Sequence, residues 1–155
     1  MANNKPIGGV ESCSLYPADA VTTAMFSCDG VEIELSGTPI EVTLLDDASK
    51  YEECAQSKLG ATCVSHLLQL VAERNEADKW LDNDFIERAY LNGLVAVVSL
   101  CDGRRLLAGY SALFGNEQPL RLENVISTSG SSLNETPSVT LRLVSQDTEF
   151  SREIL

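Results

Sequence analysis

The chain is poor in the residues on which most catalytic and metal sites depend. Its 155 residues include one histidine, His66, and the five cysteines contain no Cys-x-x-Cys pair. Zinc sites need clustered thiolate or imidazole ligands, and Ser-His or Cys-His catalysis needs an imidazole with a partner at workable spacing. The sequence therefore predicts no metal site, no cofactor site and no catalytic residue, and we expect the protein not to be an enzyme.

The chemistry nearest to His66 in the sequence does not change this expectation. Cys63 precedes it by three residues, which on a strand places the two side chains on opposite faces. We interpret His66 as a histidine on a strand surface. Carboxylate pairs such as Asp46-Asp47, Glu52-Glu53 and Asp82/Asp84 lack the glycine and distal glutamate of a calcium loop.

Basic residues are also scarce. The chain has 11 Lys and Arg against 23 Asp and Glu, and its net charge is −12. A protein that clamps nucleic acid needs a basic surface to displace counterions from phosphates, so that class is disfavoured, as is binding to an anionic membrane. The excess of acidic over basic residues is compatible with a surface along which nucleic acid moves without being bound.

Long apolar runs are missing as well, so we expect neither a signal peptide nor a membrane span. The odd number of cysteines then indicates reduced thiols that pack as small hydrophobes in an intracellular product. We expect a single β-rich domain over residues 1–155, with a flexible N-terminal arm (1–9) and a polar C-terminal tail (147–155). Phe150 and Ile154 are possible docking points of that tail.

The clearest structural signal runs from Leu94 to Ser111. Asp102-Gly103 is typical of a type I′ hairpin turn, whose two central residues need positive φ. We expect residues 94–101 to pair with 104–111. Both faces of the first strand are mostly apolar, which predicts a central strand covered on both sides.

Other patterns fill in a mainly β chain. The polar stretch 49–58 and the following 62–72 are interpreted as long strands joined around Gly60, although a helix over 47–57 is also possible because Glu, Ala, Gln and Lys form helices well. Further strands are predicted at 10–16, 21–28, 31–35, 40–45, 120–127 and 139–143.

One helix is predicted over about 75–91, with Asn75 as its cap and Asn92-Gly93 at its end. The weak helix formers Asp82-Asn83-Asp84 allow it to kink or split. The predicted fold is a β-sandwich or partly open barrel with this one helix packed against it. The expected interior includes Trp80, Leu81, Phe85, Val95, Val97, Leu106, Leu141 and Leu143.

Residues 93–148 resemble the C-terminal half of small tail structural proteins of phages and prophages. The resemblance rests on Gly-Leu-Val-Ala-Val-Val-Ser-Leu-Cys-Asp-Gly-Arg from Gly93, on Leu-Ala-Gly-Tyr-Ser with Phe114-Gly115, on Gln118-Pro119-Leu120-Arg121-Leu122, and on Pro137-Ser138-Val139-Thr140-Leu141. Residues 1–92 match this family only in layout.

The resemblance implies a tail-tube-like subunit with a β-sandwich or barrel and one helix. Such a subunit forms rings, six-fold in symmetry, that stack into a conduit for DNA. Its partners are further copies of itself and other tail proteins, and it resides in the virion tail after synthesis in the bacterial host cytoplasm. Tail-terminator and head–tail connector subunits share the general fold and remain alternatives, as does a monomeric β-domain that binds a protein or small ligand.

Three segments have too little apolar sequence to form a core of their own and are candidates for contacts between subunits: the arm 1–9, the strands 49–72 and the tail 147–155. Acidic residues repeated around a ring would form a charged belt that repels phosphates. Glu52 and Glu53 are the candidates for that lining. The alternative is an acidic surface that only keeps the protein soluble.

Overall fold

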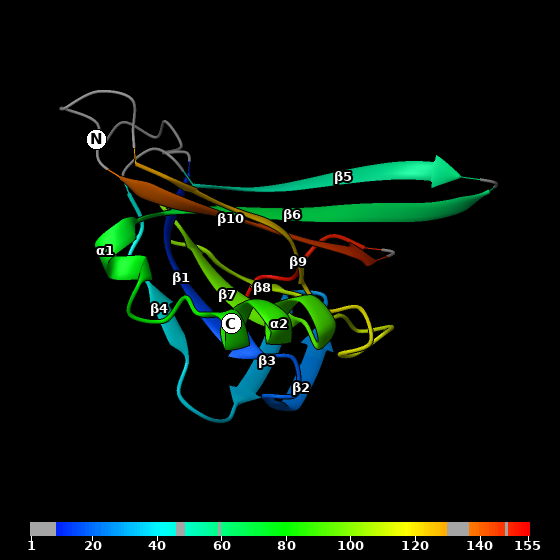
Figure 1. The fold of residues 1–155 in the computed structure, drawn as a ribbon. Helices are drawn as coiled ribbons and strands as arrows, with labels where there is room; N and C mark the ends of the chain where they lie inside the picture. Colours follow the sequence, from blue (N-terminus) through cyan, green and yellow to red (C-terminus); the bar gives the residue numbers. More distant parts are fainter. Residues whose placement is uncertain (1–8, 46–48, 59, 130–136, 148) are drawn as a thin grey trace, which may run out of the picture.

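Two four-stranded antiparallel sheets and a two-stranded hairpin make up most of the protein (Figure 1). The structure is a computed structural model that describes residues 9–45, 49–58, 60–129, 137–147 and 149–155. The sheets are not closed into a barrel. The prediction of a mainly β fold is confirmed.

The sheet at the top of Figure 1, here called the upper sheet, has the strand order β5-β6-β10-β9. The lower sheet has the order β4-β1-β7-β8, and β2 pairs with β3 in a separate hairpin. The upper strands are β5 (Lys50–Lys58), β6 (Ala61–Glu73), β10 (Ser138–Asp147) and β9 (Arg121–Thr128). The others are β4 (Ile40–Val42), β1 (Val10–Pro17), β7 (Leu94–Leu100), β8 (Arg105–Ala108), β2 (Val21–Ser27) and β3 (Gly30–Leu35).

These strands correspond to the predicted ones. The long polar stretch is strand β5, so the helical alternative for 47–57 is wrong for the part of that range that the structure describes. The strand expected at 40–45 is shorter, because β4 ends at Val42. Tyr51 explains why the polar stretch is a strand: its ring packs against the main core, whereas its neighbours on the sequence are polar.

Strand β7 is buried on both faces, as predicted. Leu94, Ala96 and Val98 belong to the main core, which lies between the two sheets and also includes Phe85. Val95 points the other way, into a second apolar cluster. The lower sheet is therefore covered by the upper sheet and a helix on one side and by the β2–β3 hairpin on the other.

The hairpin that follows β7 turns one residue earlier than expected. The Gly103 N–H donates to the carbonyl of Leu100 (3.0 Å), so Cys101 and Asp102 are the central residues of the turn. Gly103 follows them with φ +94°. This is the pattern of a three-residue loop with a glycine after the turn, and the type I′ prediction is wrong.

The predicted helix is divided into α1 (Arg74–Ala77) and α2 (Asn83–Leu91). Asp82 caps α2, since its carboxylate accepts a hydrogen bond from the Phe85 N–H at 2.7 Å. A short polar side chain that bonds its own backbone in this way begins a helix better than it continues one. The helix therefore splits, but the break covers residues 78–82, and residues 83 and 84 begin α2. Asn75 lies inside α1 and does not cap it.

Of the residues expected in the interior, half are fully buried and half lie at the border of the core. Those with 5% exposure or less are Phe85, Val95, Leu141 and Leu143. Those only partly buried are Trp80, Leu81, Val97 and Leu106. The ring of Trp80 meets that of Phe85 edge to face, with 5.1 Å between centroids, so it closes the rim of the main core rather than filling it.

Leu120, just before β9, joins the two sheets. It exchanges two backbone hydrogen bonds with Leu94, at 2.7 and 2.9 Å. Gly109 lies against this junction with φ +89°, and a Cβ there would come 2.6 Å from the Leu94 carbonyl oxygen. The close approach of three backbone segments therefore requires glycine at this position.

We predict that Val98→Asp unfolds the domain and that Val97→Asp does not. Val98 is 0% exposed in the main core, where an unpaired carboxylate costs several kcal/mol of a total stability of about 5–15 kcal/mol. Val97 is partly buried, so its carboxylate reaches water. Chemical denaturation of both variants measures the difference, and equal losses of stability would contradict this account of β7.

Candidate functional site

The hairpin of β5 and β6 extends beyond the rest of the upper sheet (Figure 1). Strand β10 ends opposite Val64, so residues 61–63 of β6 pair only with β5. Side chains near the end of the hairpin are exposed, among them those of Gln56, Ser57 and Thr62. This confirms two long strands around Gly60, and it gives the chain one element that projects away from its own core.

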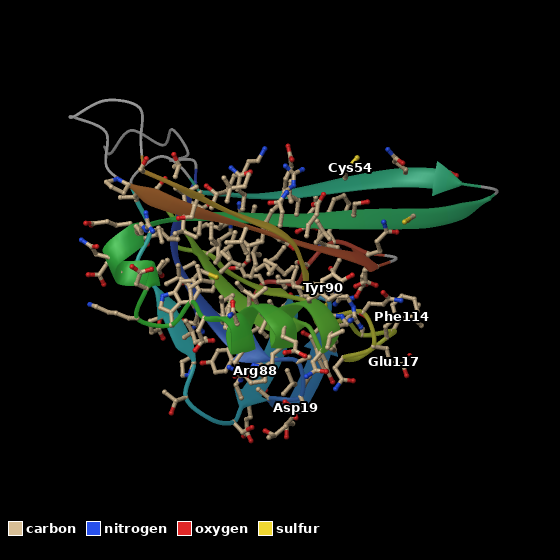
Figure 2. All side chains as sticks on the ribbon, in the orientation of Figure 1. Asp19, Cys54, Arg88, Tyr90, Phe114 and Glu117 are labelled. Carbon is tan, nitrogen blue, oxygen red and sulfur yellow. The ribbon has the colours of Figure 1, made fainter. Side chains whose placement is uncertain are left out.

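The two predicted lining residues lie on opposite faces of β5. Glu52 is exposed and lies 3.7 Å from Lys50, on the face of the upper sheet that points away from the core. Cys54 shares this outer face and points away from the body in Figure 2. Glu53 points inward, and its side chain is only 12% exposed.

Glu53 belongs to a buried polar group, here called the histidine cluster: Tyr51, Glu53, His66, Glu149 and Ser151. The Tyr51 hydroxyl lies 2.8 Å and the Ser151 hydroxyl 3.1 Å from Nδ1 of His66. The two hydroxyls also bond each other. Nε2 of His66 donates to the Glu149 carbonyl at 3.1 Å, and the Ser151 N–H donates to the Glu53 carboxylate at 3.0 Å.

His66 is 4% exposed, so its interpretation as a surface histidine is wrong. The signal that would have found this is its place in the alternation of β6. Val64, Leu68 and Leu70 fall on the same face at two-residue spacing, and all three are fully buried. The partners of His66 on the tail lie more than 80 positions away, and no local pattern points to them.

The partners fix the tautomer of His66. A carbonyl can only accept, so Nε2 carries a proton. In the neutral imidazole, Nδ1 is then the acceptor for one of the two hydroxyls. The Ser151 hydroxyl and the His66 imidazole are the same two groups that serve as nucleophile and general base in some hydrolases. However, the Tyr51 hydroxyl lies closer to Nδ1, and Ser151 lines neither of the two hollows described below. We interpret the cluster as a polar anchor for the tail.

Burial raises the pKa of the Tyr51 hydroxyl above its ordinary value of 10.0, and the negative charge of Glu53 raises it further. Burial likewise raises the pKa of the Cys13 thiol above its ordinary value of 9.0. Both groups are held in the neutral form by the fold. Neither is in the state that a nucleophile or a metal ligand needs.

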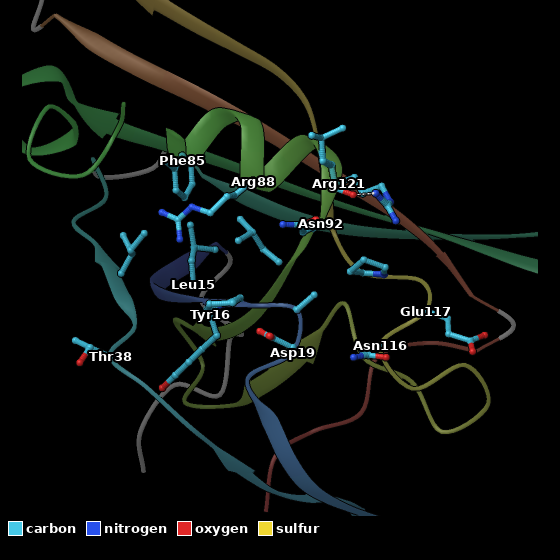
Figure 3. A pocket seen from close by; sticks show the side chains of 17 residues that line it. Leu15, Tyr16, Asp19, Thr38, Phe85, Arg88, Asn92, Asn116, Glu117 and Arg121 are labelled. Atoms are coloured by element: carbon cyan, nitrogen blue, oxygen red, sulfur yellow. Dashed lines mark hydrogen bonds between the residues drawn. The ribbon is translucent and has the colours of Figure 1, made fainter. Parts of the chain in front are cut away.

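A cavity of about 880 Å³ opens between α2, the end of β1 and the loop that precedes β9 (Figure 3). Two arginines at its wall are already engaged. Arg88 pairs with Asp84 at 3.1 Å, and Arg121 donates to the Leu91 carbonyl at 2.5 Å, at the end of α2. The cavity therefore offers apolar and polar surface but no cation that is held ready for an anionic ligand.

A second, shallower hollow of about 550 Å³ lies on the outer face of the upper sheet, and Glu52, Cys54 and Arg142 contribute to it. Among the described residues, no group of three or more His, Cys, Asp or Glu side chains is placed to hold a metal ion. No helix in the described part of the chain is long and apolar enough to span a membrane. Asp46-Asp47 and the arm before Gly9 lie outside the described residues.

All five cysteines are free thiols, but they do not all pack as hydrophobes. Only Cys13 is buried, whereas Cys28 and Cys54 are exposed. The expectation of buried cysteines is wrong for these two, because turn and edge positions face solvent whatever residue they carry.

Comparison with known proteins gives no relative. No family model, no curated protein and no solved structure matches the chain.

We predict that His66→Ala lowers the free energy of unfolding by about 2 kcal/mol or more, because the Glu149 carbonyl loses its donor and the pair of hydroxyls of Tyr51 and Ser151 loses Nδ1 as an acceptor. Ser65→Ala, whose side chain is exposed on the adjacent position of β6, is the control and should change stability by less than about 0.5 kcal/mol. Urea titration compares the two variants. A neutral effect at His66 would mean that water replaces its contacts.

The same variant tests the expectation that His66 is not catalytic. Folded His66→Ala protein should keep its function in any assay that is found, and loss of activity without loss of folding would reveal a missed site.

We also predict a loss of stability at alkaline pH that depends on Tyr51. Its pKa is raised in the folded state, so stability is fully present below pH 10 and falls above it, as the unfolded chain alone releases the proton. The loss from this group is about 1.4 kcal/mol per pH unit. Tyr51→Phe should show a shallower decline, with the Cys13 contribution remaining, and an unchanged slope would contradict the burial of this hydroxyl.

Proposed function

We propose that this protein is a structural virion protein, a tail-tube-like subunit that assembles into stacked rings and forms a conduit for DNA. The observation that carries the proposal is the projecting β5–β6 hairpin at the edge of an open four-stranded sheet. The resemblance of residues 93–148 to phage tail proteins supports it independently. The protein would act as a building block of the tail and not as an enzyme.

The upper sheet has two edge strands, β5 and β9, at opposite sides. An open edge offers backbone donors and acceptors to a further strand, and a natural protein usually covers such an edge or uses it. Pairing β5 of one copy with β9 of the next would be a head-to-tail contact. Such contacts close into a ring when the rotation between copies divides the circle.

In such a ring the outer face of the upper sheet would line the bore, because the inner face packs on the core. Glu52 lies on that face and Glu53 does not, so only Glu52 remains a lining candidate. The face carries two ion pairs, Lys50 with Glu52 and Arg142 with Glu123, at 3.7 and 3.1 Å. These two pairs make this part of the proposed wall charge-paired rather than an acidic belt. Arg121, which lines the hollow on the same face, donates to the carbonyls of Tyr90 and Leu91 instead of pairing with a carboxylate.

The proposed partners are further copies of this chain and other tail proteins, with DNA only as transiting cargo and no membrane. The proposed location is the virion tail, after synthesis in the host cytoplasm. A tail-terminator or head–tail connector role would use the same edges in a single ring without stacking.

The second candidate function is a monomeric β-domain that binds a protein or small ligand. The 880 Å³ cavity beside α2 is the observation that favours it, since its volume is in the range of small-molecule sites. Size-exclusion chromatography with light scattering separates the two functions. Rings or tubes support the first, and a monomer of 16.8 kDa at all concentrations contradicts it.

Electron microscopy of the assembled particles tests the orientation. We expect hollow rings, six-fold in symmetry, with Glu52 on the bore. A bore lined by Arg104, Arg105 and Arg121 would refute the arrangement. Arg104 and Arg105 lie at the turn of the lower sheet, whereas Arg121 begins β9 of the upper sheet.

We predict that shortening the hairpin abolishes ring formation and leaves a folded monomer. Replacing residues 57–62 by Asn-Gly keeps Gln56 opposite Cys63 and supplies a turn that suits a two-residue loop. Removing all of 49–62 would be less informative, because Tyr51 packs on the core and Ser49 bonds the Val71 N–H at 2.9 Å. Light scattering and circular dichroism report assembly and folding.

The control keeps the length of the hairpin and changes only its side chains, as Ser57→Ala with Thr62→Ala. This control should still assemble. Rings that persist after the shortening would remove the tip of the hairpin, residues 57–62, from the assembly role.

A further inference from the structure

The C-terminal segment, residues 149–155, runs between two strands that do not pair with each other, and it forms a β-bridge to each of them at Ile154 and Glu153. On one side the Val31 N–H of β3 donates to the Glu153 carbonyl at 2.9 Å, and the Leu155 N–H donates to the Val31 carbonyl at 3.0 Å. The segment thus extends the β2–β3 hairpin by one strand, parallel to β3.

On its other side the segment pairs with β8, the edge of the lower sheet. The Leu107 N–H donates to the Arg152 carbonyl at 3.1 Å, and the Ile154 N–H donates to the Arg105 carbonyl at 2.8 Å. The gap between β3 and β8 is here called the strand slot. One short piece of chain therefore fills it and hydrogen-bonds to the backbone groups on both of its sides.

The slot is shaped for this segment. Ile154 packs against Val31 and Leu107, which are 0% and 1% exposed. Gly30 has φ +151°, and a Cβ there would come 2.3 Å from the Glu153 carbonyl oxygen. Only glycine lets the segment approach so closely.

Two further contacts hold the start of the segment. The Arg152 guanidinium lies 5.7 Å from the centroid of the Phe26 ring and donates to the Ser27 carbonyl. Ser151 bonds His66 in the histidine cluster. The groups that receive the segment therefore belong to β2, β3, β5, β6 and β8.

We propose that the strand slot is a binding site for residues 149–155 of a second copy, so that two chains can exchange their C-terminal strands. The segment is covalently connected to the rest of its chain only through residues 147–149. Every contact above would be the same if the segment came from another copy. Exchange of an identical element is a low-cost route to association, and an emptied slot presents two strand edges that select an added strand. This inference does not depend on the proposed ring.

Complementation between two damaged full-length chains tests it. One carries Ile154→Asp, which spoils the segment and leaves the slot intact. The other carries Gly30→Val, which blocks the slot and leaves the segment intact. Both carry the Asn-Gly hairpin, and each is first measured alone by light scattering, so that any association through other surfaces is seen before mixing.

We expect each chain alone to be a monomer and the mixture, after joint refolding, to form a one-to-one dimer. Folded chains that stay monomeric in the mixture would overturn the proposal. A dimer of either chain alone would also overturn it, because one partner would then lack a matching slot or segment.

A second measurement covers the case in which either variant fails to fold. A protease site placed between Asp147 and Glu149 of the otherwise unchanged chain is cut after folding, and a labelled peptide of residues 149–155 is added in excess. Joint unfolding and refolding should incorporate the labelled peptide and not its Ile154→Asp version. Failure to incorporate the labelled peptide, or equal incorporation of both, would overturn the proposal.

Discussion

The burial of β7 on both faces is the constraint on which the rest of the structure depends. A strand with apolar side chains on both faces needs a layer on each side of its sheet. The upper sheet and α2 cover the face of Leu94 and Val98, and the β2–β3 hairpin covers the face of Val95. The hairpin has no hydrogen bonds of its own to the lower sheet among the described pairings, and the C-terminal segment, residues 149–155, bonds to both. The last residues of the chain therefore complete a core that its middle begins.

The histidine cluster links this completed core to the projecting hairpin. Tyr51 and Glu53 lie at the base of β5, and both contact the tail through Ser151. A buried hydrogen-bond network whose members are all satisfied favours one arrangement over others, because each alternative leaves a polar group without a partner. The cluster thus fixes the direction in which the hairpin leaves the body. In the proposed ring, the hairpin would meet a neighbouring copy at a defined place, and a fixed base would serve that contact.

The strands, the split helix and the double coverage of β7 could be predicted because each depends on local patterns: alternation, turn residues and weak helix formers in sequence order. The errors have a common origin in contacts between distant segments. Glu52 and Glu53 look alike in the sequence, and only the tail, nearly 100 positions further on, distinguishes them by offering the Ser151 N–H to Glu53. Val97 was expected in the interior because both faces of β7 are apolar. However, the β2–β3 hairpin that covers this face buries Val95 fully and Val97 only in part.

In the proposed tube, the charge that DNA would meet depends on a few side chains and not on the net charge of −12. Exposed acids such as Glu32 and Glu34 lie on β3, on the opposite side of the lower sheet from the upper sheet. Packed sheets are spaced by about 10 Å, which is also roughly the distance over which physiological salt screens a charge. Charges two layers away are therefore largely screened at the outer face of the upper sheet. There the ion pairs Lys50–Glu52 and Arg142–Glu123 contribute to the local field, and the cation of each pair is matched by a carboxylate. In the proposed tube, these paired charges would neither hold a phosphate nor strongly repel it, which is the property that a wall for passing DNA requires.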